Sequence, residues 1–170
     1  MSTPEHFISI FARNCEVKAI SKEEAAEFLR RHHLYGDAAC RYRYGLYQVR
    51  GKKCLYETNM PDTTEQLVAV ATFSSARKWE KEGREYRSYE WVRYASIQGT
   101  RVIGGMSKLL KHFIAEHKPD DVMAYAPEKY FTGETYAQLG FIQEDRKLFP
   151  DGNSSLKFRY RVTHQPSDSQ

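Results

Sequence analysis

The spacing of hydrophobic residues along the chain predicts three helices. In the first, from Lys22 to about His33, the apolar positions share one face, and Ser21 with Glu24 has the spacing of a capping box at its start. A second helix follows two adjacent glycines, with apolar side chains at helical spacing at Met106, Leu109, Leu110, Phe113 and Ile114. This spacing predicts a core position for Met106. A short third helix is expected from Thr132 to Leu139.

Alternating or continuous apolar runs predict seven strands, at residues 16–20, 44–50, 66–74, 89–96, 122–126, 141–149 and 156–162. The run at 122–126 suits a buried strand that lies parallel to its predecessor across a helix. The strand at 89–96 is expected to alternate, so that Glu90, Val92 and Tyr94 share one face.

One segment between the predicted strands is unusually rich in charge. Residues 77–87 read RKWEKEGREYR, with Trp79 and Tyr86 as their large apolar side chains. Such a run is typical of a solvated loop. The alternative is a loop that reorders over a substrate, with Trp79 among the residues that contact it.

Composition bounds the kind of protein. With 170 residues, 41% of them hydrophobic, the chain is long enough for one globular domain over residues 1–162, followed by a disordered tail over 163–170. It opens with no secretory leader and has no apolar run long enough to span a bilayer, which indicates a cytoplasmic protein. Cys15, Cys40 and Cys54 have neither zinc nor disulfide spacing, so no metal is expected. The net charge of +4 permits an anionic partner without demanding one.

The stretch Arg101–Ser107 is the strongest candidate for binding chemistry. It lies between a predicted strand and a predicted helix, and it contains Gly104 and Gly105. Free backbone N–H groups at a helix start favour an anion such as phosphate, and glycines allow the ligand to approach the backbone closely. Paired glycines also occur for packing alone, so both interpretations stay open at this point.

Titratable residues elsewhere suggest a second kind of chemistry. Glu90 lies on a largely apolar strand, where a carboxylate is costly to bury without a partner or a task. His33 and Tyr35 follow the first helix. A histidine at a helix end commonly serves only to balance the helix dipole, and a functional role for His33 is the alternative.

Two motifs in the second half of the chain resemble the GNAT superfamily of acyl-CoA N-acyltransferases. Arg-x-x-Gly at Arg101 and Gly104 resembles the first motif, although Met106 stands where a small residue is usual. Tyr-Ala-Gln-Leu-Gly-Phe, residues 136–141, resembles the second. The resemblance covers roughly residues 16–149. It implies an α+β fold with a single mixed, mostly antiparallel sheet of about six to seven strands flanked by helices.

A narrower resemblance links the chain to GNAT-like domains of phage and bacterial proteins that are similar to Mom-type DNA-modifying acyltransferases. It rests on Gly-Leu-Tyr at residue 45, LVAVATF, YEWVRYAS, VIGGMSKLLKHF and GETYAQLGF. Members of that group often carry Ala where this chain has Met106, and Asp where it has Pro127.

The resemblance implies a cofactor, acetyl-CoA or another acyl-CoA, and roles for particular residues. Tyr136 would protonate the departing thiolate, and Glu90 would act as the general base, with His33 in reserve. Acceptor contacts are expected from His33, Tyr35 and Trp79. The residues expected to hold the cofactor are Ala95, Ser96, Arg101, Val102, Ile103, Gly104, Gly105, Met106 and Ser107.

Three functions therefore follow from the sequence. The first is acyl transfer from acetyl-CoA to the amine of a small molecule or peptide. The second is Mom-like modification of a nucleobase, with DNA as partner. The third is a non-catalytic module that binds CoA or nucleic acid. None of them implies a membrane partner, and the sequence leaves monomer and homodimer equally open.

Overall fold

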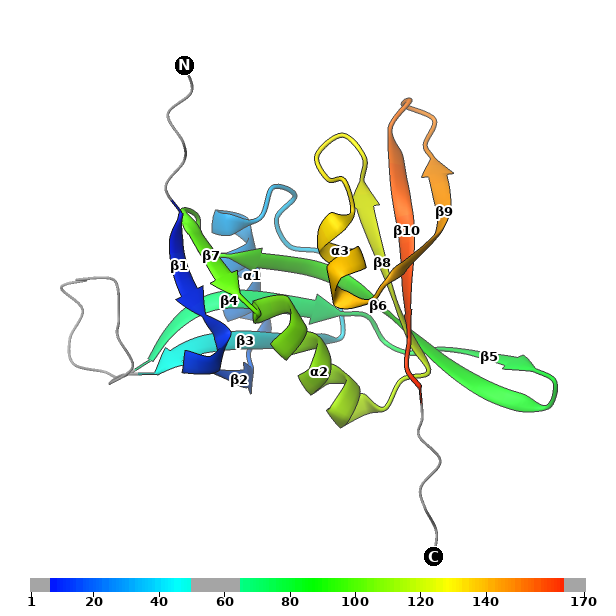
Figure 1. Cartoon of the computed structure of the whole chain (residues 1–170), viewed down its shortest axis with the longest axis horizontal. Helices are drawn as coiled ribbons and strands as arrows, with labels where there is room; N and C mark the ends of the chain where they lie inside the picture. The colour runs from blue at the N-terminus through cyan, green and yellow to red at the C-terminus, as the bar shows by residue number, and fades with distance from the viewer. Residues whose placement is uncertain (1–6, 50–64, 164–170) are drawn as a thin grey trace, which may run out of the picture. The chain divides into compact units, whose positions relative to one another are not determined.

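The computed structural model describes residues 7–49 and 65–163 (Figure 1). The predicted tail, apart from Thr163, lies outside these ranges, as does Cys54. The helical elements are η1 (Ala12–Asn14), α1 (Lys22–His32), α2 (Gly105–His117) and α3 (Glu134–Leu139). The strands are β1 (Ile8–Phe11), β2 (Cys15–Ala19), β3 (Tyr42–Val49), β4 (Glu65–Phe73), β5 (Arg77–Lys81), β6 (Arg84–Ser96), β7 (Thr100–Ile103), β8 (Asp121–Pro127), β9 (Ile142–Leu148) and β10 (Ser154–Arg161).

Eight of the described strands form one mixed sheet, in the order β2-β3-β4-β6-β8-β10-β9, with β5 paired to β6. The pairing of β6 with β8 is parallel, as predicted for strands joined across a helix, and the β2–β3, β3–β4, β5–β6, β8–β10 and β9–β10 pairs are antiparallel. The predicted α+β fold is confirmed. The sheet exceeds the predicted six to seven strands because β5 joins it, and the short β1–β7 pair was not foreseen.

The described chain divides into two compact units. Of the described residues, the first comprises 7–49, 65–73 and 93–112, and the second 74–92 and 113–163. Both β6 and α2 run through the two units. In the first unit α1 begins as the capping box predicts, since the Ser21 hydroxyl accepts a hydrogen bond from the Glu24 amide. The apolar face of α1 packs on side chains of the sheet, and this core contains Ala25, Phe28, Leu29, Val70 and Ala95.

In the second unit the sheet has two contrasting faces. Residues paired across antiparallel strands point to the same face, so Ala124 and Phe158 share one face while Met123 and Arg159 share the other. The first face is apolar and is covered by α3 and the end of α2. The second face carries charged side chains.

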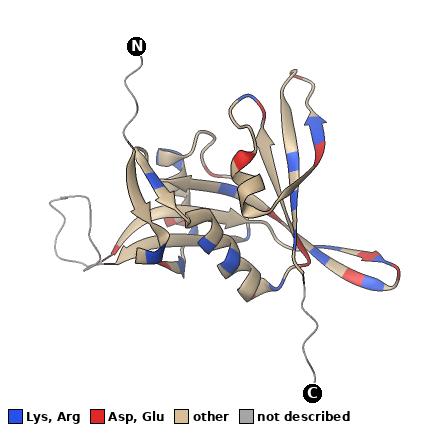
Figure 2. Ribbon diagram, in the orientation of Figure 1, with Lys and Arg blue, Asp and Glu red and all other residues tan. Residues whose placement is uncertain are grey.

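The segment predicted as a solvated loop is in fact a hairpin. β5 pairs with β6 through a two-residue turn at Glu82 and Gly83, and both residues have positive φ, 53° and 77°. Two left-handed residues match the turn to the twist of the strands. The prediction failed because Glu rarely adopts this conformation, so Glu-Gly is a weak hairpin signal. Charged residues of both signs line the hairpin in Figure 2.

β6 also departs from the strict alternation expected of it. The Tyr89 ring contacts Phe113 of α2, and the Tyr94 hydroxyl lies beside Gly105 of the same helix, although five positions separate the two tyrosines. Strict alternation would point them in opposite directions. The expectation that Glu90 shares a face with Tyr94 is therefore wrong. One extra residue inserted into the strand, as in a β-bulge, accounts for the change of face.

Candidate active site

A tight glycine turn connects β7 to α2 in the first unit. Gly104 has φ of 76°, a left-handed conformation that glycine adopts without the cost of a Cβ. The Lys108 amide donates to the Gly104 carbonyl at 3.0 Å and is the first to be bonded within the helix. The amides of Gly105, Met106 and Ser107 precede it and have no acceptor inside the helix. Three amides at the positive end of a 13-residue helix suit a phosphate in charge and geometry.

The structure narrows the predicted phosphate loop. Arg101, Val102 and Ile103 belong to β7, which pairs with β1. The expectation that these three residues form part of a loop is therefore wrong. Val102 is buried, and the exposed Arg101 places its guanidinium 5.7 Å from the centre of the Phe7 ring. The residues that can present free amides are therefore those from Gly104 to Ser107.

The sequence predicted a core position for Met106 and left open whether the paired glycines serve packing or ligand binding. Met106 is half-buried and lies outside the buried core, so the prediction of a core side chain is wrong. The glycine beside it, Gly105, has a packing reason. A Cβ there would lie 2.8 Å from the Tyr94 hydroxyl and 2.9 Å from a Val102 methyl group, closer than atoms pack.

The end of β6 is hydrogen-bonded on the side that faces β4. The Ile97 amide donates to Val68 of β4, and the Ser96 hydroxyl donates to the Thr100 carbonyl at 3.3 Å. Ala95 is buried in the α1 core. The pairing of β6 with β8 covers Ser88–Trp91, and no pairing of these two strands beyond Trp91 is found in the described chain. Ala95 and Ser96 thus lie in the part of β6 beyond this ladder.

Tyr136 lies on α3, over the apolar face of the second unit. Its ring contacts those of Phe141 and Phe158, each 5.4 Å away between centroids, and that of Trp91 at 6.5 Å. The helix approaches the sheet closely because Gly133, with φ of 83°, lies over Phe158. A Cβ at that position would come within 2.3 Å of the ring. The half-buried Tyr136 is held by aromatic neighbours on three sides.

Glu90 lies on the other face of the same unit. It pairs in register with Met123, whereas its neighbours Tyr89 and Trp91 point to the apolar face. Its main chain is bonded twice to Ser74, whose hydroxyl accepts from the Glu90 amide and whose amide donates to the Glu90 carbonyl. The structure therefore does not bring Glu90 and Tyr136 together on one face of the sheet.

His33 and Tyr35 form a small cluster with Arg93 in the first unit. The Tyr35 amide donates to Nδ1 of His33 at 3.0 Å, and the Arg93 guanidinium lies 5.9 Å from the centre of the Tyr35 ring. Arg93 is held by Nε, which donates to the Gly36 carbonyl. Burial, and then the positive charge of Arg93, lower the pKa of His33, which favours the neutral imidazole.

Trp79, the third predicted acceptor contact, lies on β5 in the second unit. Its ring stacks on the Tyr86 ring, with 4.4 Å between the ring centroids, and its Nε1 donates to the Ser88 hydroxyl at 2.8 Å. It lines a cavity on the charged face of the sheet together with residues that sequence reasoning did not single out, among them Asp121 and Arg159. These residues are far apart in the sequence, so no local motif marks them.

The described residues form neither a metal-binding cluster nor a membrane-spanning helix. Among residues 7–49 and 65–163, no group of three or more His, Cys, Asp and Glu side chains is placed to hold a metal ion. The described helices include none with the length and apolar character needed to cross a membrane.

Solved structures of acetyltransferases share this architecture. An acetyltransferase from Corynebacterium glutamicum, described as histone acetyltransferase HPA2 and related acetyltransferase, is 13% identical, with a TM-score of 0.59 over 91% of this chain and 99% of that one. The NatC complex bound to Gag peptide and CoA matches with 14% identity, TM-score 0.57, and coverage of 88% and 99%. A GNAT-family acetyltransferase from Bacillus cereus matches with 10% identity, TM-score 0.50, and coverage of 88% and 99%.

The fold is that of the GNAT acetyltransferases. No protein-family model and no curated protein matches the chain. The predicted GNAT fold is confirmed by structures that share few residues with this chain, so the likeness concerns architecture. The closer resemblance to Mom-type enzymes is not tested by these structures and stays a prediction.

Proposed function

We propose that this protein is an acyl-CoA-dependent N-acyltransferase that transfers an acyl group, acetyl in the simplest case, to the amine of a small molecule or peptide. The observation that carries the proposal is the turn at Gly104, after which the first amides of α2 have no acceptor inside the helix, within a GNAT fold. A site of this kind binds a phosphate group through the backbone, with no need for a dedicated basic side chain.

The glycine turn is the proposed site for the CoA pyrophosphate. The amides of Gly105, Met106 and Ser107 would donate to its oxygens, and Gly104 would keep side-chain atoms away from them. Lys108 is not needed as a direct contact, because its ammonium group donates to the carbonyls of Ala12 and Cys15. The solved NatC structure contains CoA, which supports this choice of anion.

Main-chain groups of β6 beyond Trp91 are the proposed partners of the pantetheine amides. The ladder with β8 ends at the pair Trp91–Ala124, and the change of face between Tyr89 and Tyr94 falls in the same part of the strand. A bulge leaves backbone groups outside the regular ladder, and such groups can pair with an extended amide chain. Ala95 and Ser96 lie in this stretch.

Acyl-CoA supplies an activated acyl group, so a bound amine can attack it directly. Tyr136 is the proposed general acid, whose hydroxyl would donate its proton to the departing sulfur. Its ring is held by Phe141 and Phe158, which leaves the side chain little freedom to turn away. Direct attack needs no nucleophilic cysteine.

The general base is proposed from two candidates. Glu90 would act through water, since it lies on the opposite face of the sheet from Tyr136. His33 has an imidazole that favours the neutral form, as a base requires, but Nδ1 accepts from the Tyr35 amide, so Nε2 carries the ring proton. His33 would therefore take the proton at Nδ1, after releasing the Tyr35 amide. Glu90→Gln and His33→Gln distinguish them, because only the variant of the true base should lose the rising limb of the pH–rate profile.

The proposal is tested by the binding of acetyl-CoA, measured by thermal unfolding. A ligand that binds the folded state raises the melting temperature. Ser107→Glu places a carboxylate in the first turn of α2, where it suits the helix dipole but repels pyrophosphate. We expect this variant to fold normally and to lose the acetyl-CoA shift.

Lys111→Gln is the matched control, since it makes the same change in net charge about one turn further along α2. It should keep the acetyl-CoA shift. Release of free thiol from acetyl-CoA in the presence of amines and peptides then tests turnover. The proposal is wrong if millimolar acetyl-CoA fails to stabilise the unmodified protein, or if Ser107→Glu binds as well as the control.

A further inference from the structure

The β5–β6 hairpin presents an ordered row of side chains on one of its two faces. The cross-strand pairs on this face are Arg77 with Ser88 and Trp79 with Tyr86. The two rings stack at an angle of 16°, and the Trp79 indole is fixed by its hydrogen bond to Ser88. On the other side of the ring pair, the Arg84 guanidinium lies 4.8 Å from the centre of the Tyr86 ring. The hairpin thus carries a flat aromatic surface with an arginine at each end.

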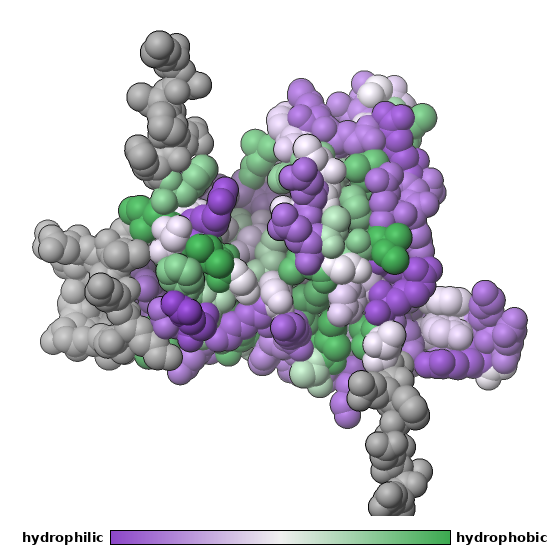
Figure 3. All heavy atoms as spheres, in the orientation of Figure 1, coloured by the Kyte–Doolittle hydropathy of each residue, from purple (hydrophilic) through white to green (hydrophobic). Residues whose placement is uncertain are grey.

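This face lines a cavity of about 520 Å³ on the charged face of the second unit. The remaining walls come from β8, β9 and β10. In Figure 3 hydrophilic side chains cover the end of the hairpin and the outer edge of the molecule at β9. The lining contains five cationic side chains, Arg77, Arg84, Lys157, Arg159 and Arg161, and three carboxylates, Asp120, Asp121 and Glu144. The cavity therefore has an excess of positive charge.

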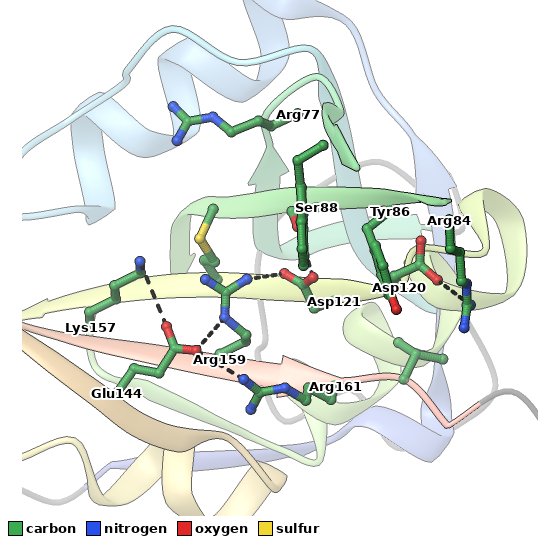
Figure 4. A pocket seen from close by; sticks show the side chains of 13 residues that line it. Arg77, Arg84, Tyr86, Ser88, Asp120, Asp121, Glu144, Lys157, Arg159 and Arg161 are labelled. Carbon is green, nitrogen blue, oxygen red and sulfur yellow. Dashed lines mark hydrogen bonds and ion pairs between the residues drawn. The ribbon is translucent and has the colours of Figure 1, made fainter. Parts of the chain in front are cut away.

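The carboxylates of the cavity are already engaged. Asp121 accepts from Ser88 at 2.8 Å and from Arg159 at 2.5 Å, and Asp120 accepts from Arg84 at 3.1 Å. Glu144 is shared by three cations, with Arg159 at 2.6 Å, Arg161 at 3.2 Å and Lys157 at 3.7 Å. Figure 4 shows Arg159 between Asp121 and Glu144. One carboxylate cannot neutralise three cations, so an anion is the complementary ligand.

Two arginines of the lining are available to such an anion. The Arg77 side chain makes no ion pair or hydrogen bond with any residue in the described part of the chain, and it extends away from the Arg159 network in Figure 4. The side chain of Arg161 is 65% exposed and reaches Glu144 through one terminal nitrogen only. Both guanidinium groups can donate several hydrogen bonds to a phosphate.

We propose that this cavity binds a nucleotide, with the base stacked on Trp79 and the phosphate bound by Arg77, which lies two residues before Trp79 on the same face of β5. Trp79 is 39% exposed, so part of the indole remains open to a ligand ring. A simple anion or an acidic peptide would use the cations but would leave the rigid aromatic pair without a role. A base stacks on an aromatic side chain while arginines follow the phosphate, which uses both features. The proposal does not depend on acyl transfer, since Tyr136 lies on the opposite face of the sheet.

The ligand could be a free nucleotide or one unit of a single strand, and two probes separate these sources. Thymidine monophosphate represents the first and a fluorescent oligothymidylate the second, and neither carries the adenine of CoA. Binding is measured by Trp fluorescence and by fluorescence anisotropy at low salt. Equal affinity for both probes identifies a free nucleotide. Much tighter binding of the oligomer, weakening steeply with salt, identifies a strand.

Three exposed hairpin residues give variants with a matched control. Trp79→Leu should weaken binding about 5-fold to 100-fold through loss of stacking. Arg77→Ala should also weaken it and, for the oligomer, lower the salt slope by about one. Lys78 lies on the other face of the hairpin, where it is opposite Arg87 in the ladder and pairs with Glu85. Lys78→Ala therefore removes a neighbouring cation outside the cavity and should leave the affinity unchanged.

Several outcomes would overturn the proposal. It is wrong if neither probe binds at low salt. It is also wrong if Trp79→Leu binds as the unmodified protein does, or if poly-glutamate competes as well as oligothymidylate, since both results indicate a site for simple anions. If Ser107→Glu loses acetyl-CoA binding but still binds the nucleotide probes, the two sites are separate. If Ser107→Glu also loses binding of the nucleotide probes, the cavity proposal is contradicted while the proposed acyl-CoA site stands.

Discussion

The two faces of the sheet in the second unit differ in how their side chains are held. Along β10 the residues alternate, with Phe158 and Tyr160 on one face and Arg159 and Arg161 on the other. Phe158 is 4% exposed and packs against the Tyr136 ring of α3, with 5.4 Å between the ring centroids. Arg159 is held by two carboxylates from neighbouring strands. One strand thus contributes to an apolar core and to a polar network.

The two faces should respond differently to substitution of their side chains. Apolar packing is not directional, and its loss costs both transfer free energy and a cavity. An ion-pair network depends on each partner, because a charge left alone in a shielded position is costly. The apolar face therefore places Tyr136, whereas the charged face provides side chains that a ligand can recruit.

The largest expected effect concerns catalysis on the apolar face. Tyr136→Phe keeps the ring packing and removes only the hydroxyl, so kcat should fall about 10²-fold to 10⁴-fold while the melting temperature barely changes. Tyr125→Phe is the control on the opposite face, and kcat should be unaffected. The measurement is thiol release from acetyl-CoA with an amine that the unmodified protein accepts. Equal rates for Tyr136→Phe and Tyr125→Phe would remove Tyr136 from the mechanism.

Next in size is the loss of apolar packing. Phe158→Ala removes a buried ring beneath Gly133 and Tyr136, and should lower the free energy of unfolding by about 3–5 kcal/mol. Lys157→Ala, one residue earlier and on the charged face, should cost less than about 1 kcal/mol. Urea unfolding of both variants checks the contrast. Similar costs would show that the two faces contribute alike to stability.

A change in the polar network should have a somewhat smaller effect. Arg159→Met leaves Asp121 without its cation in a nearly buried position, which should cost about 3 kcal/mol, at the lower end of the range because Ser88 still donates to Asp121. The double variant with Asp121→Asn should recover much of the loss. If the single variant is as stable as the unmodified protein, the network does not stabilise the fold.

The smallest effect is a dependence of stability on pH. The hydrogen bond from Arg159 lowers the pKa of Glu144 below its ordinary value of 4.5. A carboxylate with a lowered pKa in the folded state stabilises the fold fully above about pH 4.5, and this contribution is lost as the pH falls through the folded value. Glu144→Gln should remove this acid-sensitive contribution, which is at most about 1 kcal/mol. Unfolding at pH 3 and pH 6 tests it, with the exposed Glu80→Gln as the control.

Local features were predictable because neighbouring residues determine them. The Ser21 cap needs only the Glu24 amide three positions later, and Gly140 ends α3 with φ of 99° because a residue with a Cβ adopts that conformation poorly. The helix after the glycine pair was expected from periodicity alone. The GNAT fold could be predicted because such segments occur in the required order.

Long-range features could not be predicted because they depend on which strands become neighbours. The sequence determines that Gly104 is followed by a helix with free amides, since both the turn and the helix arise from adjacent residues. Only the tertiary structure decides that β7 pairs with β1, that β6 changes face between Tyr89 and Tyr94, and that β5 joins β6. It also decides that Trp79, Asp121 and Arg159 meet in one cavity. Each of these contacts joins segments far apart in the chain, and their energies depend on spatial fit that no local pattern records.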